Sequence, residues 1–207
     1  MKKFLTLFTL SFFALFGTSS QGFTADTDPK IISEVTVFIE NLGNDFINIT
    51  KEKSTSEEVK KQKIIAAIDN AIDSNWIARF VLGKNYRRSS VQQKERFTEL
   101  YREFMINTYG PKFKNYNGRE FKVMEISKQN RFFLVKSEFH SEGSNTPILV
   151  DFRVKERKGK LVVLDFIAEG ISLIETQRSE FNSAISNGGM EKFLDNLELR
   201  VKDLKNN

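Results

Sequence analysis

Between residues 119 and 168 the hydrophobic side chains recur at every second position, which limits the possible fold more than any other feature of the chain. A period of two is typical of β-strands that bury one face. Turn-forming residues interrupt this pattern at residues 142–145 and at Lys158-Gly159-Lys160. Because such short connections join antiparallel neighbours, the sequence predicts a meander of four antiparallel strands, the last over residues 161–168.

This fourth strand carries apolar residues on both faces and runs into an acid-glycine hinge at Glu169-Gly170. A strand of that kind either packs between helices or lines an apolar space. The sequence leaves both interpretations open. They differ in function, because the second is typical of a protein that carries an apolar ligand.

Helical spacing dominates on both sides of the predicted strands. Capping patterns predict helix starts at Asp28-Pro29, Thr55/Glu58 and Ser90/Gln93. Glycines predict helix ends or breaks at Gly83, Gly110-Pro111 and Gly188-Gly189. The order of these elements is typical of an α+β protein, with N-terminal helices, a four-stranded antiparallel sheet and two C-terminal helices.

Residues 1–25 have the pattern of a secretory signal peptide, with two lysines, an apolar run from Phe4 to Gly17 and small residues near Gly22 and Ala25. The run is shorter than the roughly 20 residues that span a bilayer as a helix. Cleavage after Gly22 or Ala25 would export a single domain, residues 26–207. An uncleaved N-terminal anchor is the alternative.

The chain has no cysteine and only one histidine, His140. It therefore lacks disulfides, and it has neither a thiol nor a second histidine to complete a catalytic triad or an ordinary zinc site. Asp165 and Glu169 are the carboxylates best placed as an acid and a base. We interpret Asp165 instead as the partner of a nearby arginine or backbone amide, and Glu169 as the cap of the following helix. We predict no enzyme, no metal and no cofactor.

After residue 25 the chain carries 30 basic and 27 acidic residues. This small excess argues against nucleic acid as a partner and leaves anionic membranes and acidic proteins open. Two segments, 84–88 and 112–116, mix basic and aromatic side chains. Such mixing can bind nucleic acid or a phosphate head group, although it is more typical of a solvated loop with partly buried rings.

Five segments, in order along the chain, resemble the MlaC, or toluene-tolerance, family of periplasmic phospholipid-binding proteins. They are WIARFVLG (76–83), SVQQKERFTELYREFMINTYG (90–110), VDFR (150–153), DFIAEGISL (165–173) and RSEFNSAISNGGMEKFLDNL (178–197). None is a catalytic signature, and their order behind a signal peptide carries the resemblance. Trp76 and Gly110-Pro111 depart from the residues common in the family at those positions.

The resemblance implies a fold related to nuclear-transport-factor-like domains, with an apolar cavity between sheet and helices for phospholipid acyl chains. It also implies a periplasmic carrier that maintains outer-membrane lipid asymmetry. Its partners would be an outer-membrane lipoprotein–porin complex and an inner-membrane ABC transporter complex with its substrate-binding membrane protein. A periplasmic chaperone or adaptor that binds apolar protein segments is the alternative.

Within that implied cavity we expect two walls and a mouth. The sheet wall is expected to consist of Phe133, Val135, Val150, Phe152, Leu164 and Phe166. The helical wall is expected to consist of Trp76, Phe80, Phe104 and Tyr109. Ile171, directly after Gly170, is expected at the mouth.

Overall fold

The computed structural model describes residues 28–109 and 118–206 of the chain. The helices are α1 (Pro29–Lys51), α2 (Glu57–Ala71), α3 (Ser74–Leu82), α4 (Lys84–Arg88), α5 (Val91–Tyr109) and α6 (Leu173–Asn206). The strands are β1 (Gly118–Gln129), β2 (Phe132–Ser141), β3 (Ile148–Arg157), β4 (Lys160–Ala168) and β5 (Ile171–Ser172). The predicted α+β class is confirmed. The expected signal peptide, Gly110-Pro111 and the cluster at 112–116 lie outside the described residues.

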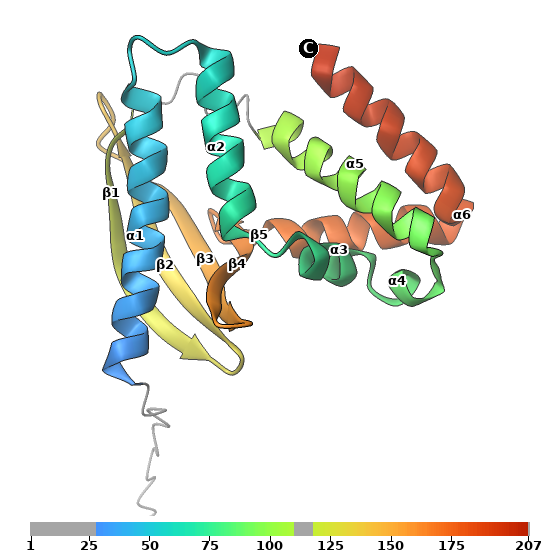
Figure 1. Ribbon diagram of the computed structural model, residues 1–207, viewed down its shortest axis with the longest axis horizontal. Helices are drawn as coiled ribbons and strands as arrows, with labels where there is room; N and C mark the ends of the chain where they lie inside the picture. The colour runs from blue at the N-terminus through green and yellow to red at the C-terminus, as the bar shows by residue number, and fades with distance from the viewer. Residues whose placement is uncertain (1–27, 110–117, 207) are drawn as a thin grey trace, which may run out of the picture.

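The elements form two groups that lie side by side (Figure 1). In the first group, α1 and α2 lie along the sheet. In the second, α3 and α5 pack on the long helix α6, and α4 joins them. The molecule therefore has one helix-on-sheet part and one all-helical part.

The sheet has the strand order β1-β2-β3-β4-β5 with antiparallel neighbours throughout, so the predicted meander is confirmed. The structure adds β5, a strand of only two residues after the hinge, which pairs with the end of β4. At the β3–β4 turn, Lys158 and Gly159 have φ of 52° and 75°. Two consecutive positive φ values between the paired Arg157 and Lys160 are those of a tight hairpin turn.

Hydrogen bonds at the helix starts confirm two of the three predicted caps. The Asp28 carboxylate accepts from the Lys30 amide at 2.9 Å, and Ser90 and Gln93 bond each other's backbone amides at 3.1 and 2.9 Å. The third prediction was wrong by one residue. Helix α2 begins at Glu57, so Ser56 rather than Thr55 accepts from the Val59 amide, while the Thr55 hydroxyl donates to Glu52.

Gly189 interrupts α6 with φ 81° and ψ 169°, values outside the helical region. The two predicted C-terminal helices are therefore present as two arms of α6 that meet at a sharp bend (Figure 1). Glycine is suited to this position because a side chain would strain a backbone at positive φ.

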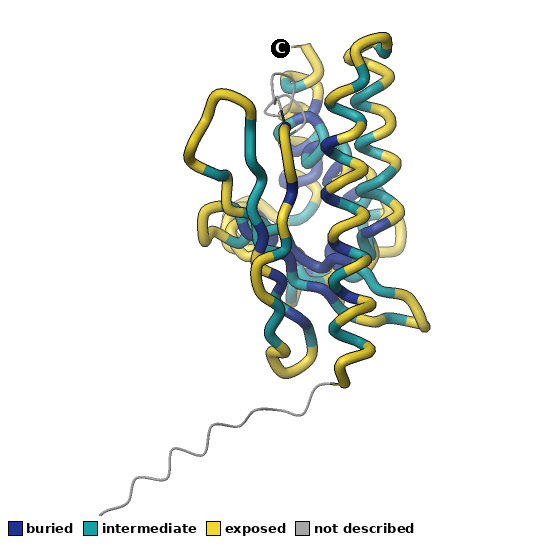
Figure 2. The backbone as a smooth tube through the Cα atoms, turned by 90° about the vertical axis from the view of Figure 1, so that its left-hand side faces the viewer, coloured by how far each residue is buried: buried dark blue, intermediate teal, exposed yellow. Residues whose placement is uncertain are grey.

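Two hydrophobic cores correspond to the two groups of elements, and buried stretches follow both in Figure 2. In the sheet core, Val35, Ile39 and Ile47 of α1 form one cluster with side chains of all four long strands, namely Phe121, Phe133, Val135, Phe152, Val154 and Val163. The helical core is formed by α3, α5 and both arms of α6 around Phe97, Phe104, Phe181, Phe193, Leu194 and Leu197. Each core is closed by its own helices.

Gly43 brings α1 into close contact with β1. A Cβ atom at this position would lie 2.2 Å from the Phe121 ring, a distance that real side chains do not reach. Gly43→Ala is therefore expected to lower the free energy of unfolding by about 1–2 kcal/mol, since overpacking outweighs the better helix propensity of alanine. Urea unfolding measures the effect.

Gly188→Ala is the matched control for this substitution. A Cβ atom there would meet only the flexible Lys192 side chain, at 3.2 Å. An equal loss of stability in both variants would contradict the close contact with Phe121 as the cause.

Candidate apolar binding site

The two cores meet at Ile72, the residue that follows α2. Its half-buried side chain packs against both cores, and its backbone forms an isolated parallel bridge with Val163 of β4. This junction is therefore a boundary between the two hydrophobic cores.

Helices α2 and α5 flank this junction, and an ion pair joins them. Asp69 of α2 accepts from Arg102 Nε of α5 at 2.9 and 3.0 Å through its two carboxylate oxygens, and Arg102 Nη2 also donates to it. Otherwise α2 packs on α1 and β4, whereas α5 packs on α3 and α6. The ion pair thus spans the boundary between the two groups.

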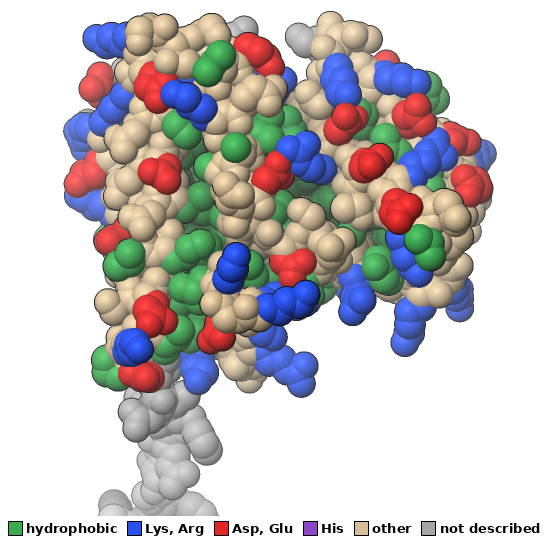
Figure 3. Space-filling model, in the orientation of Figure 1, with side chains coloured by type: hydrophobic (Ala, Val, Ile, Leu, Met, Phe, Trp, Pro, Cys, Tyr) green, Lys and Arg blue, Asp and Glu red, His purple; other side chains and the backbone are tan. Residues whose placement is uncertain are grey.

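Apolar side chains flank the ion pair on both helices and are only half-buried. Residues three or four apart share a helix face, which places Ile65 and Ile72 beside Asp69 and places Met105 and Ile106 beside Arg102. All four are of intermediate burial. Figure 3 shows hydrophobic side chains gathered where the surface is hollowed between α2 and α5. We call this feature the α2–α5 cleft.

A buried glutamine organises the α5 side next to the cleft. Gln177 of α6 accepts a hydrogen bond from the Tyr101 hydroxyl and donates to Met105 Sδ at 3.1 Å and to the Tyr109 hydroxyl at 3.3 Å. Burial raises the pKa of both tyrosines, so their hydroxyls stay neutral. Thr108 Oγ1 is also buried and has no hydrogen-bond partner among the described residues.

On the sheet side, a β-bulge sets which side chains of β4 join the sheet core. Arg153 pairs with Asp165 and the next residue, Val154, pairs with Val163, so Leu164 is the extra residue of the bulge. At this residue the alternation of β4 side chains between the two faces of the sheet shifts by one position. Val163 and Phe166 consequently both pack with the sheet core, although they are three residues apart. Sequence reasoning missed Val163, because a strict alternation puts it on the opposite face.

The structure distributes the expected wall residues between the two cores rather than around one open space. Phe133, Val135 and Phe152 are buried in the sheet core, and Val150 and Phe166 are half-buried against it. Leu164 is buried at the bulge. Phe104 is buried in the helical core, Trp76 and Phe80 stack on each other at its edge with ring centroids 5.2 Å apart, and Tyr109 is half-buried beside Gln177.

Ile171, the expected mouth residue, is 61% exposed. It pairs with Ala168 across the β4–β5 turn, in which Glu169 and Gly170 have positive φ. A large exposed hydrophobic residue on an edge strand has no packing role in the described structure.

Asp165, the candidate acid, is a structural residue. Its carboxylate accepts from Arg153 Nη1 at 2.9 Å, from the Ser172 hydroxyl at 2.6 Å and from the Ile174 amide at 3.3 Å. The expectation of an arginine or amide partner is confirmed, and both are present. Burial raises the pKa of Asp165, while the hydrogen bonds from Ser172 and Ile174 act in the opposite direction.

The expectation that Glu169 caps the next helix was wrong. Glu169 Oε1 accepts from the Leu149 amide at 3.0 Å, and its own amide donates to the Leu149 carbonyl, so it secures the start of β3. The cap of α6 is Ser172, whose hydroxyl accepts from the Glu175 amide. Asp165 and Glu169 therefore have separate structural partners and no shared cleft.

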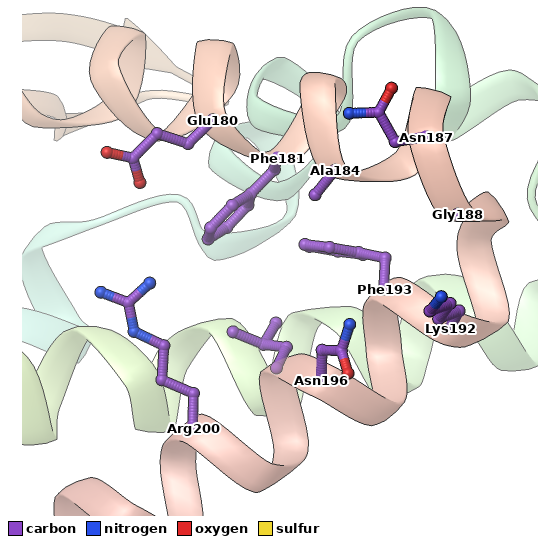
Figure 4. Close-up of a pocket in the computed structure, with 10 residues that line it drawn as sticks. Glu180, Phe181, Ala184, Asn187, Gly188, Lys192, Phe193, Asn196 and Arg200 are labelled. Carbon is purple, nitrogen blue, oxygen red and sulfur yellow. The ribbon is translucent and has the colours of Figure 1, made fainter.

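A second hollow, of about 340 Å³, lies between the two arms of α6. Figure 4 shows Phe181 and Phe193 extending into it from opposite arms, with Glu180, Lys192 and Arg200 at its rim. The bend at Gly189 produces this hollow by turning the second arm back along the first. The Gly188-Gly189 pair was the sequence signal for the bend, but it did not indicate a concave surface.

Residues 28–109 and 118–206 contain no group of three or more His, Asp or Glu side chains arranged to hold a metal ion. In the same ranges no helix has both the length and the apolar character that crossing a membrane requires.

Comparison with known proteins identifies a family and two similar proteins. A family model described as "MlaC protein" matches residues 40–199. The intermembrane phospholipid transport system binding protein MlaC of Haemophilus influenzae is 22% identical over 123 residues. That match spans 57% of this chain and 57% of the relative, so a little more than half of the relative's length is covered.

A solved structure shares the fold. The phospholipid-binding protein from Ralstonia solanacearum, determined in complex with a phospholipid, superposes with a TM-score of 0.73. The likeness covers 82% of this chain and 98% of that chain at 19% sequence identity. At this identity the comparison establishes a common architecture.

Proposed function

Because the chain belongs to the MlaC family, we propose that it is a phospholipid carrier that holds the acyl chains between its two hydrophobic cores. The single observation that supports this most is the junction at Ile72, where separately closed cores meet beneath a half-buried apolar cleft. The phospholipid in the Ralstonia solanacearum relative, which has the same architecture, supports the class of ligand.

The physical requirement for a carrier is an apolar interior. Each CH₂ group exposed to water costs about 0.8 kcal/mol, so two sixteen-carbon chains amount to roughly 25 kcal/mol. A cavity that replaces bilayer by protein makes the transfer nearly neutral. No covalent step is needed, and the side chains that sequence reasoning weighed for catalysis have structural roles here.

In this proposal the two cores part along the α2–α5 cleft and the expected residues line the lipid from both sides. The sheet wall is Phe133, Val135, Val150, Phe152, Leu164 and Phe166, and the structure adds Val163 as a further candidate. The helical wall is Trp76, Phe80, Phe104 and Tyr109. Filling by acyl chains offsets the cost of separating the two groups, because apolar surface stays out of water.

The family relationship supports extending this proposal to a cellular role. Residues 1–25 would direct export to the periplasm, where the domain would exchange lipid with an outer-membrane lipoprotein–porin complex and with an inner-membrane ABC transporter complex. The name of the Haemophilus influenzae relative, which places it in an intermembrane phospholipid transport system, supports this role.

Extraction of the purified protein with organic solvent, followed by mass spectrometry, tests the carrier function. We expect about one phospholipid per chain, the ratio of a single internal site. Protein without phospholipid that retains affinity for apolar peptides would contradict the proposal and favour the chaperone or adaptor instead.

Ile171→Glu is expected to reduce the amount of bound phospholipid while leaving the fold intact. A charged side chain at the mouth would contact the apolar acyl chains, which is unfavourable. Its effect on the free energy of unfolding should stay within about 0.5 kcal/mol, since the side chain is largely exposed. Lipid per chain and urea unfolding are measured on the same sample.

Leu199→Glu is the matched control, because Leu199 is 58% exposed but lies on the second arm of α6. Unchanged lipid content in Ile171→Glu, or an equal loss in both variants, would contradict the placement of the mouth.

A further inference from the structure

The structure carries a basic surface that neither the apolar cleft nor the lipid explains. Residues 74–94 contain five basic side chains and no acidic one, whereas the rest of the chain after residue 25 has 25 basic against 27 acidic residues. The five are Arg79, Lys84, Arg87, Arg88 and Lys94. We call them the α3–α4 basic patch. Figure 3 shows Lys and Arg side chains along the lower edge of the molecule, below α3 and α4.

Four of these five cations are exposed, and none of the five is paired with a carboxylate of the described residues. Arg79, Lys84, Arg87 and Arg88 are exposed and Lys94 is half-buried. No carboxylate of residues 28–109 or 118–206 forms an ion pair with any of the five. Eleven other lysines and arginines in these ranges do form ion pairs, among them Arg96, Arg102 and Arg153. Unpaired cations keep their full attraction for an external anion.

Tyr86 holds part of the patch in place. Two cations lie over its ring, the Arg79 guanidinium 5.3 Å and the Lys94 ammonium 4.9 Å from the ring centroid. Arg178 of α6 adds a sixth cation beside the patch, stacked on Phe80 and bonded to the Phe80 carbonyl at 2.6 Å. The positive charge is therefore fixed to the fold rather than carried on a tail.

A hollow of about 430 Å³ opens within the patch. Lys84 and Arg88 stand at it, polar groups of Asn85, Ser89 and Ser186 line it, and Ile185 and Met190 provide apolar surface. Cations beside hydroxyl groups suit phosphate oxygens. Nearby, Val91 at the start of α5 is 62% exposed, which gives the edge of the patch an apolar residue.

We propose that the α3–α4 basic patch docks the protein on an anionic phospholipid bilayer. Several exposed, unpaired cations around a phosphate-compatible hollow, with an apolar residue at the edge, fit an interfacial surface of head groups better than a single shaped partner. The proposal goes beyond lipid carriage, because it concerns the outside of the molecule and holds whether or not the cores contain lipid.

Co-sedimentation with phospholipid vesicles tests the proposal on the protein after signal removal. We expect binding to phosphatidylcholine vesicles that contain phosphatidylglycerol, little binding to phosphatidylcholine alone, and release as ionic strength rises. The triple variant Lys84→Gln, Arg87→Gln, Arg88→Gln should bind the anionic vesicles roughly a hundredfold more weakly, and each single variant roughly fivefold more weakly.

The matched control removes three positive charges from another part of the surface. Lys53→Gln, Lys61→Gln and Lys202→Gln lie on the α1–α2 turn, on α2 and near the end of α6, at the opposite end of the molecule (Figure 1). This control should keep most of the binding. Equal weakening in both triple variants would overturn the proposal, because it would show only a net-charge effect.

Two further outcomes are decisive. Absence of binding of the unchanged protein to anionic vesicles would overturn the proposal and favour an acidic protein as the partner of this patch. The phospholipid content of the triple variant, measured in parallel, should equal that of the unchanged protein. Loss of vesicle binding can then be distinguished from loss of the carrier function.

Discussion

Asp165→Ala is expected to lower the free energy of unfolding by about 3 kcal/mol at neutral pH. The carboxylate is 1% exposed and joins β4 to β3, to β5 and to the start of α6 through Arg153, Ser172 and the Ile174 amide. Its removal leaves the half-buried Ser172 hydroxyl and the buried Ile174 amide without this acceptor. Chemical denaturation followed by circular dichroism measures the loss.

Glu175→Ala is the control within the same network. Glu175 accepts from the same Arg153 Nη1 at 2.6 Å, but its side chain is 55% exposed. Exposed ion pairs contribute at most about 1 kcal/mol, so this variant should remain close to the unchanged protein. Similar losses in both variants would mean that charge on Arg153, rather than the buried hydrogen bonds of Asp165, stabilises the hinge.

The pH dependence of the Asp165→Ala effect has a predicted sign. Desolvation raises the pKa of Asp165 above its ordinary value of 3.8, so the folded chain holds this proton more tightly than the unfolded chain. The stabilisation from Asp165 is therefore fully present below pH 3.8 and declines as pH rises through the raised pKa. The difference in unfolding free energy between the unchanged protein and Asp165→Ala should be larger in acid than at neutral pH.

A difference that instead grew with rising pH would contradict this sign. It would show that the attraction of Arg153 for the carboxylate exceeds the cost of burying the charge. Asp165→Asn, which keeps the shape and loses the charge, should show little of this pH dependence and serves as the reference.

Local patterns were sufficient to predict most of the fold. The alternation in β1 to β4, the Lys158-Gly159 turn and the break at Gly189 depend on neighbouring residues, and each was predicted at or near its place. The caps show the limit of this reasoning. Thr55 and Ser56 are adjacent and chemically similar, so a shift of one residue in the start of α2 changes which of them caps the helix.

Contacts between residues far apart in the sequence were not predictable in the same way. The bulge at Leu164 depends on pairing with β3, and it reversed the faces that strict alternation assigns to Val163. Glu169 bonds the Leu149 amide, 20 residues away, rather than the helix that follows it. The division of the apolar residues into two cores likewise depends on how α5 and α6 fold back, which periodicity alone does not encode.

The Asp69–Arg102 ion pair is the contact with the clearest functional consequence under the carrier proposal. If the two cores part along the α2–α5 cleft, then a covalent link across it should trap the lipid. The chain has no cysteine, so Asp69→Cys with Arg102→Cys provides the only two thiols for a short bismaleimide linker. We expect the linked protein to exchange phospholipid with vesicles slower by roughly tenfold or more, because a gate that cannot open blocks the route.

Loss of the ion pair alone should have a small and opposite effect. Its side chains are 33% and 44% exposed, so the pair contributes at most about 1 kcal/mol, and the unlinked double cysteine variant should exchange lipid up to roughly fivefold faster. Fluorescent phospholipid transfer measures both forms of the same protein before and after linking.

The Arg96–Asp195 ion pair offers a matched control, since it joins α5 to α6 within the helical group at 2.8 Å. A linker between cysteines at these two positions fastens helices that already pack on each other in the same core. Exchange should then stay near that of the unlinked protein. Equal slowing by both linkers would indicate general stiffening of the protein and would place the lipid route elsewhere. Slowing by the Asp69–Arg102 linker alone requires that α2 and α5 separate when lipid passes.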